Sequence, residues 1–298
     1  MLNKDYLLKL AGKNQTTPDN IFREYAQNVF LSFLYQKKDG RKMLFKGGTA
    51  LKIVYQSPRF SEDLDFTLEE ITFPQIEKTV LSVLGDLEKE NFQPQIVESK
   101  ETSGGYLAEL AVSVHQERVN LSLQGSQRKE KNIKKEVVLI VNDFIPNYTV
   151  YLLEETVLIE EKISAALTRA KPRDFFDIYY LLRGGYIPAG LKGKLLPIPE
   201  LLEKKQINFQ KELAHLLPYS MRGLVKEFPN RFLKKLKNLV NLRHVSRLKH
   251  LMPQTLQAFH ASQASSDSKN GHFLPKSANL LKNFSPWKEI YLMSSKLR

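Results

Sequence analysis

The chain has 298 residues, of which 42% are hydrophobic and 26% charged, a globular composition that excludes a wholly disordered protein. It has no cysteine, which excludes disulfides, thiolate metal ligands and a cysteine nucleophile. Lys and Arg number 45 against 32 Asp and Glu, and the net charge of +13 points to a polyanionic partner such as nucleic acid. A merely basic, soluble surface is the alternative.

No apolar run is long enough to cross a membrane, and the N-terminus has no secretory signal, so we expect a cytoplasmic protein without a membrane partner. The length suggests about two domains. We expect a lobe of helices and strands over residues 1–150 and a helical lobe over 151–252. Residues 253–298 are predicted to form a weakly ordered basic tail, rich in Ser, Gln and Asn.

Hydrophobic periodicity predicts the elements in chain order. The first 40 residues are expected to be helical, with Asp19 as a candidate N-cap. Further helices are predicted over Thr49–Tyr55, Pro74–Glu90 and several stretches after Thr156. Strands are predicted over Met43–Phe45, 63–67, Gln95–Val97, Tyr106–Val114, Val119–Leu123 and Val137–Val141. Two basic elements complete the chain: a hairpin loop over Gln127–Glu136, and an amphipathic helix over Arg231–Met252 with seven Lys/Arg and no acid.

Asp63 and Asp65 are two residues apart on a predicted strand, so their carboxylates project from the same face. Two carboxylates this close raise each other's pKa unless a cation lies between them. A Mg²⁺ ion would serve, because it prefers hard oxygen ligands and is usually completed by substrate phosphates. The alternative is an exposed strand end with two solvated acids.

Gly47 and Gly48 lie between a short predicted strand and a predicted helix. Glycine lets the backbone approach a phosphate closely, and a helix N-terminus supplies free N–H groups and a positive dipole end. A plain strand-to-helix turn is the alternative. A Gly-Gly turn followed by Asp-x-Asp after fourteen intervening residues is a rarer combination than either feature alone.

A second segment brings cations and carboxylates onto two consecutive predicted helices. Lys162 and Arg169 share a helical face with the small Ala166, which leaves Lys162 room to extend into a cleft. A cation there would bind a triphosphate and offset the charge that develops in phosphoryl transfer. Asp174 and Asp177 share a face of the next helix, where they would orient these cations or meet the metal site. An inter-helix salt-bridge network is the alternative.

A Gly-Gly or Gly-Ser turn before an Asp-x-Asp strand is typical of the DNA polymerase β-like nucleotidyltransferase superfamily, which this chain resembles. More closely, it resembles the AbiEii family of nucleotidyltransferase toxins. The resemblance is carried by Lys46-Gly47-Gly48-Thr49-Ala50-Leu51 and Arg59-Phe60-Ser61-Glu62-Asp63-Leu64-Asp65-Phe66, then by Glu161–Arg169 and Arg173–Tyr179. It covers roughly residues 20–230. It implies an α+β fold, with a small mixed β-sheet flanked by helices and a mainly helical C-terminal lobe.

The resemblance also implies an activity and partners. The family members transfer a nucleoside monophosphate from an NTP to a hydroxyl of RNA, notably the tRNA 3′ end, with Mg²⁺ or Mn²⁺, and so block translation. They are toxins of bacterial type IV toxin–antitoxin or phage-defence systems, each with a cognate antitoxin protein. Carried over to this chain, the catalytic residues are Asp63, Asp65, Lys162 and Asp177, with the first two as metal ligands. The nucleotide-binding residues are Lys46, Gly47, Gly48, Thr49, Ser61 and Arg169.

One family feature is missing. Polymerase β-like enzymes usually have a third carboxylate on a later central strand, and family members tend to carry an acid near the place of Ser122. The candidate strand, Val119–Gln124, contains no acid. Glu109 and Glu117 are nearby in sequence but outside the expected pattern. Three possibilities stay open: Asp177 takes part, water or substrate accepts the proton, or activity is low.

The basic helix and the hairpin loop are expected to flank the cleft and to neutralise RNA phosphates without reading sequence. A solvated helix face is the alternative. Two other functions stay open, namely a small-molecule nucleotidyltransferase and a non-catalytic nucleic-acid-binding protein; the net charge argues against the first. The predicted RNA-binding residues of the helix are Arg231, Lys234, Lys235, Lys237, Arg243 and Arg247.

Overall fold

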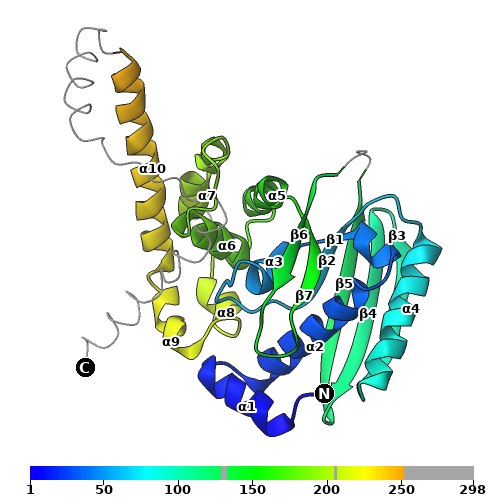
Figure 1. The fold of residues 1–298 in the computed structure, drawn as a ribbon. Helices are drawn as coiled ribbons and strands as arrows, with labels where there is room; N and C mark the ends of the chain where they lie inside the picture. Colours follow the sequence, from blue (N-terminus) through cyan, green and yellow to red (C-terminus); the bar gives the residue numbers. More distant parts are fainter. Residues whose placement is uncertain (129–132, 205–206, 252–298) are drawn as a thin grey trace, which may run out of the picture. The chain divides into compact units, whose positions relative to one another are not determined.

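The computed structural model describes residues 1–128, 133–204 and 207–251, and Figure 1 shows how their elements are arranged. The chain forms two compact units, Met1–Lys234 and Lys235–Arg298. The first unit contains a mixed α+β fold with one sheet. The division into lobes at residue 150 stays a prediction, and the predicted tail after residue 252 lies outside the described residues.

The N-terminal segment forms two helices, α1 (Lys4–Lys13) and α2 (Pro18–Leu34), and a short 3-10 helix, η1 (Asp39–Lys42). The prediction of Asp19 as the N-cap was wrong. Thr17 caps α2, and its side chain accepts a hydrogen bond from the backbone N–H of Asn20. Pro18 needs no partner for a backbone N–H and has a φ suited to the first turn, so the cap falls one residue before it.

A seven-stranded sheet forms the core of the first unit, with strand order β3-β4-β5-β2-β1-β7-β6. β1 pairs in parallel with β7, and β2 in parallel with β5, while all the other neighbours are antiparallel. The strands are β1 (Met43–Lys46), β2 (Asp63–Leu68), β3 (Gln93–Thr102), β4 (Gly105–Val114), β5 (Glu117–Gln127), β6 (Lys135–Ile140) and β7 (Tyr148–Leu153).

Strand β7 was not predicted from the sequence. Its six residues run almost directly into a helix, with no glycine or proline to mark the boundary. Its extended conformation is set by its neighbours, since β7 lies between β1 and β6. β3 and β5 are also longer than predicted, because their exposed polar ends lack the apolar alternation on which the prediction depended.

The two faces of the sheet differ in chemistry at β2. The buried Leu64 and Phe66 alternate along the strand with the half-buried Asp63 and Asp65. Helices α2 and α4 (Phe73–Lys89) pack side by side across the sheet, as Figure 1 shows. Helix α3 (Gly47–Ile53) follows β1 without a loop and packs against β1 and β2.

The rest of the described chain is helical. The two helices that matter most for the site are α5 (Glu155–Thr168) and α6 (Pro172–Arg183), which pack against each other. They are followed by η2 (Lys192–Leu195), α7 (Ile198–Lys204), α8 (Phe209–Leu213), α9 (Tyr219–Arg222), η3 (Gly223–Val225) and α10 (Phe228–Leu251). Among the described helices, none is both long and apolar enough to cross a membrane.

Candidate active site

The acidic pair lies at the start of β2, where Asp63 and Asp65 are both half-buried and on the same face. Two side chains hold this end of the strand with three hydrogen bonds. Gln27 of α2 donates from Nε2 to the carbonyl oxygens of Ser61 and Glu62, each at 3.1 Å. Thr49 of α3 donates its hydroxyl to the carbonyl oxygen of Asp63. Burial raises the pKa of Asp63, and the negative charge of Asp65 raises it further.

The two glycines let α3 begin directly against this pair. Gly47 has φ +82°, and a Cβ on it would lie 1.9 Å from Oδ2 of Asp65. A Cβ on Gly48 would lie 2.5 Å from Nη2 of Arg59 and 2.6 Å from Oγ of Ser61. A Cβ at either position would therefore force groups of the candidate site to move, because they already fill this space.

Asp177 of α6 is the centre of a buried ion cluster. Its exposed fraction is 1%, and Arg59 binds it with two bonds, Nε to Oδ1 at 2.8 Å and Nη2 to Oδ2 at 3.0 Å. Lys162 of α5 donates to Oδ2 at 2.9 Å. Burial opposes ionisation, but Arg59 and Lys162 together hold the pKa of Asp177 below its ordinary value. Both carboxylate oxygens are thus engaged by cations, which makes Asp177 an anchor for Arg59 and Lys162.

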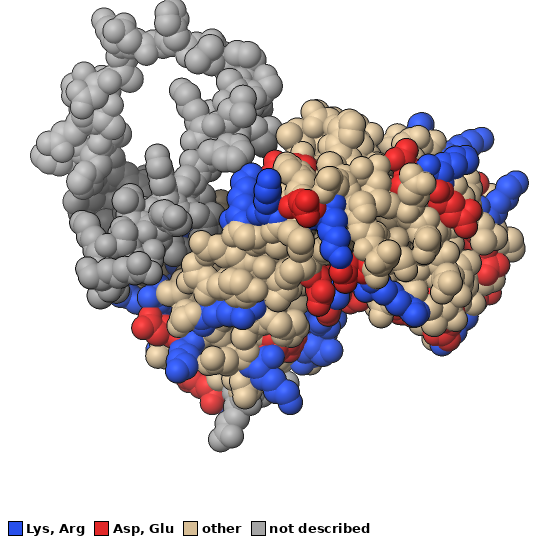
Figure 2. Space-filling model, turned by 90° about the horizontal axis from the view of Figure 1, so that it is seen from below, with Lys and Arg blue, Asp and Glu red and all other residues tan. Residues whose placement is uncertain are grey.

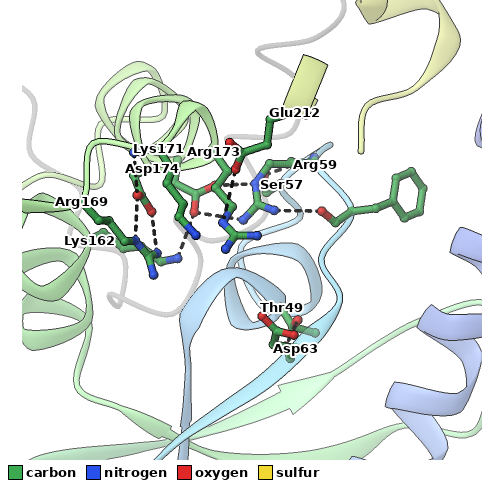
Figure 3. Close-up of polar contacts among 12 residues, drawn as sticks. Thr49, Ser57, Arg59, Asp63, Lys162, Arg169, Lys171, Arg173, Asp174 and Glu212 are labelled. Atoms are coloured by element: carbon green, nitrogen blue, oxygen red, sulfur yellow. Dashed lines mark hydrogen bonds and ion pairs between the residues drawn. The ribbon is translucent and has the colours of Figure 1, made fainter. Parts of the chain in front are cut away.

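A second ion pair joins the end of α5 to the start of α6, as Figure 3 shows. Arg169 binds the fully buried Asp174 through Nε at 2.8 Å and Nη2 at 2.6 Å. Asp174 also accepts a bond from the backbone N–H of Lys171 at 3.3 Å. The pKa of Arg169 is raised, first by its hydrogen bonds to Asp174. The turn between the helices therefore carries Arg169 and Lys171, and Arg173 follows in the first turn of α6.

Lys46 is the last residue of β1. It is directly across from Asp65 in the antiparallel β1–β2 pair. Its Nζ donates to Oγ of Ser126 at 2.7 Å and lies 3.3 Å from Oε2 of Glu161, which also binds Arg128. Burial, and next the charge of Arg128, lower the pKa of Lys46 to about 8. This ammonium group is therefore poorly solvated.

These groups line one cavity of about 460 Å³ between the sheet and helices α5 and α6. Six cations and six acids contribute to its wall, so it is polar and charged. The cations are Lys46, Arg59, Lys162, Arg169, Lys171 and Arg173, and the acids are Glu62, Asp63, Asp65, Glu161, Asp174 and Asp177. Among the described residues, no group of three or more His, Cys, Asp or Glu has the spacing of a complete metal site. The Asp63–Asp65 pair alone suits a Mg²⁺ ion that takes its remaining ligands from phosphates and water.

The structure brings most of the predicted site residues together on this cavity: Lys46, Gly47, Gly48, Ser61, Asp63, Asp65, Lys162, Arg169 and Asp177 all line it. Thr49 differs, because it is fully buried and its hydroxyl is used by the Asp63 carbonyl. It supports the strand from behind and does not reach the cavity. Sequence reasoning missed Arg59, whose role depends on a partner 118 residues away. Its only signal was its place two residues before Ser61 in the motif.

The predicted RNA-binding residues lie on α10. Arg231 is bound to Glu227 at 2.7 Å, so part of its charge is neutralised, while the side chains of Lys234, Lys235 and Lys237 are exposed. The side chains of Arg243 and Arg247 are outside the described residues. Figure 2 shows one face of the molecule, on which basic and acidic side chains are interspersed. The basic walls around the cavity stay a prediction.

A mixed sheet that carries an Asp-x-Asp pair beside a Gly-Gly turn, facing a cation-lined cavity, defines a nucleotidyltransferase of the polymerase β-like class. The chain belongs to the AbiEii family of nucleotidyltransferase toxins of type IV toxin–antitoxin systems, whose family model matches residues 30–260. This confirms the resemblance seen in the motifs. No protein of curated function matches the chain in sequence.

Solved structures share the fold. MenT4, a nucleotidyltransferase toxin from Mycobacterium tuberculosis H37Rv, is 17% identical with a TM-score of 0.58, covering 80% of this chain and 90% of its own. A nucleotidyltransferase structure from Helicobacter pylori is 21% identical with a TM-score of 0.52, covering 76% of this chain and 98% of its own. JHP933 from Helicobacter pylori is 20% identical with a TM-score of 0.50, covering 79% of this chain and 99% of its own. These likenesses confirm the predicted fold class.

Proposed function

We propose that this toxin transfers a nucleoside monophosphate from an NTP to a hydroxyl group of RNA, releasing pyrophosphate. The observation that supports this best is the pairing of Asp63 and Asp65 with a cavity lined by six cations. An NTP carries several negative charges on its phosphates, and a cavity of about 460 Å³ is in the range of small-molecule sites. The charge pattern suits an anionic substrate bound together with a metal ion.

The residues divide into two groups by what they touch. Asp63 and Asp65 would hold Mg²⁺ or Mn²⁺, which would bridge to the phosphates and neutralise charge that develops on them. Lys46, Arg169 and Lys171 line the cavity and are not bound to Asp177, so they are proposed to meet the phosphates. Each of the first two already has one anionic partner, so phosphate would compete with or join that partner.

Lys162 and Arg59 take a different part in this proposal. Both are buried and share Asp177, which fixes their positions before substrate arrives. Cations held in place in this way stabilise the negative charge that develops in the transition state, and their side chains do not have to reorganise during the reaction. Asp177 is therefore proposed as a positioning residue whose own oxygens need not meet the metal.

RNA is the proposed acceptor because of the net charge of +13 and the exposed lysines of α10. The family resemblance points to the tRNA 3′ end, to blocked translation and to a cognate antitoxin protein as partner. The cytoplasm is accordingly the proposed site of action. A small-molecule acceptor would need no extended basic surface, so it is the second outcome of the test.

The test supplies the protein with each of the four α-labelled NTPs, MgCl₂ and either unfractionated tRNA or a panel of aminoglycosides. The expected result is label on RNA with one or two NTPs, and none after chelation with EDTA. Label on an aminoglycoside and none on tRNA would move the assignment to a small-molecule enzyme.

The variant Asp63→Ala/Asp65→Ala gives the matched comparison. It should transfer no label and should no longer inhibit growth when expressed, while keeping the parent's circular dichroism spectrum. The control Glu88→Ala/Glu90→Ala changes the charge by the same amount at exposed positions at the C-terminal end of α4, and it should behave as the parent. A double alanine variant of the aspartates that still inhibits growth would overturn the enzymatic interpretation of the site.

A further inference from the structure

The cross-strand register of the sheet places Glu109 in line with Asp63 of the acidic pair. Asp63 of β2 is directly across from Ser122 of β5, and Ser122 is directly across from Glu109 of β4. Directly opposite residues in paired strands project from the same face. Asp63, Ser122 and Glu109 therefore form a single row across three neighbouring strands.

The row is joined by a hydrogen bond. The Ser122 hydroxyl donates to Oε1 of Glu109 at 2.6 Å, a short distance typical of a bond to an ionised carboxylate. Because this hydroxyl donates its hydrogen bond to Glu109, its lone pairs are free to accept, and Nε2 of Gln124 donates to it at 3.3 Å. Gln124 lines the cavity, so the row is connected to it.

Glu109 is also unusual in having no counter-ion among the described residues. Four acids that line the cavity each have a cation: Asp177 has Arg59 and Lys162, Asp174 has Arg169, Glu161 has Lys46, and Glu62 has Arg23. Across the described part of the chain, Asp63, Asp65 and Glu109 are the acids of this region that are not ion-paired. The charge of Glu109 reaches Asp63, whose pKa it helps to raise after burial and the nearer acids.

We propose that Glu109, acting through the Ser122 hydroxyl, supplies the function of the third carboxylate that β5 lacks. This inference rests on the proposed nucleotidyl transfer. As the acceptor oxygen forms its bond to Pα and the bond from Pα to the bridging oxygen breaks, pyrophosphate leaves. The proton of the attacking hydroxyl passes to Ser122 Oγ, while Ser122 passes its own proton to Glu109. Protons and charge balance without any additional reactant.

The arrangement explains why an acid on β5 is dispensable in this chain. Glu109 lies one strand further from Asp63 than the missing acid would, but its side chain is longer than that of aspartate. The hydroxyl of Ser122, at the place of the missing acid on β5, bridges the rest of the distance. Neither residue lies in the Asp-x-Asp or Gly-Gly motifs.

The experiment measures single-turnover transfer of label from NTP to unfractionated tRNA, nucleotide affinity by equilibrium binding, and Tm. Glu109→Gln should slow transfer by roughly 10²-fold, the usual contribution of a proton acceptor, with nucleotide affinity and Tm close to the parent's. Ser122→Ala should slow transfer similarly, although Glu109 is intact. The key variant is Glu109→Gln/Ser122→Asp, which puts an acid directly on β5 and should recover roughly tenfold or more of the lost rate.

Glu98→Gln is the matched control, because Glu98 is directly across from Glu109 on β3, is exposed and is paired with Lys100 at 2.6 Å. It should transfer at the parent's rate. Transfer by Glu109→Gln at the parent's rate would overturn the inference. It would also be overturned if Glu109→Gln/Ser122→Asp folds and binds nucleotide but transfers no faster than Glu109→Gln. If Glu109→Gln does not fold, Ser122→Ala decides in the same way. Failure of the proposed function would give a different result. Either Asp63→Asn would label RNA at the same rate as the parent, or the parent itself would label no RNA. In both cases the inference about Glu109 would be wrong too.

Discussion

The buried cluster at Asp177 makes the strongest stability prediction. Asp177→Asn keeps the shape of the side chain but removes the negative charge that Arg59 and Lys162 share. Arg59 is 3% exposed and Lys162 is 7% exposed, so neither cation can recover its lost partner from water. Removal of one partner from a buried ion pair costs about 3–5 kcal/mol. For a unit of this size each kcal/mol lowers Tm by about 2–4 °C, so Tm should fall by about 6–20 °C.

Thermal unfolding followed by circular dichroism measures this change. Asp143→Asn is the control, since Asp143 makes an exposed ion pair with Lys13 at 2.8 Å, and exposed pairs contribute about 1 kcal/mol or less. A Tm of Asp177→Asn within about 2 °C of the parent would refute the buried-cluster argument. Arg59→Gln should also be destabilising, and the double variant with Asp177→Asn should lose less than the sum of the two, because both break the same pair.

Three further predictions follow from the same site. Gly48→Ala should weaken NTP binding at least roughly tenfold, measured by equilibrium binding, because its Cβ would displace the Arg59 guanidinium; unchanged affinity would contradict this. The lowered pKa of Asp177 means that its stabilisation is present above its ordinary pKa of about 3.9 and is lost as pH falls through the lower folded value. In thermal unfolding below about pH 4, the difference in Tm between the parent and Asp177→Asn should therefore become smaller. A difference in Tm that does not change with pH would refute the lowered pKa of Asp177. Asp63→Asn should slightly raise Tm in EDTA while abolishing transfer, because burial and then Asp65 disfavour the ionised form of Asp63; a lower Tm would contradict the repulsion argument.

Local patterns predicted the parts of the site that depend on spacing along the chain. The alternation at 63–67 places Asp63 and Asp65 on one face, and β2 confirms the strand. Helical spacing brought Lys162 and Asp177 onto adjacent helices, which the structure joins by a bond of 2.9 Å. What these residues do in catalysis stays a prediction.

The parts that sequence reasoning missed depend on partners that no local pattern contains. Arg59 acquires its position from a carboxylate 118 residues later. Glu109 enters the row with Asp63 only through the registers of two strand pairs, β4 with β5 and β5 with β2. The extended state of β7 likewise comes from its neighbours β1 and β6. In each case the information is in tertiary packing, which outweighs local propensity.

The wide separation of the two halves of the ion cluster has a consequence for synthesis of the protein. The aspartate pair and the glycine turn are made early, but Lys162 and Asp177 are added only after more than half of the chain. Contacts between distant segments form late because their loop-closure entropy must be met first. A nascent or proteolysed fragment that ends before α5 thus holds Asp63, Asp65 and Arg59 without the buried members of the ion cluster on α5 and α6. Toxicity should therefore be absent from incomplete chains and should appear only once α6 has been made and has folded.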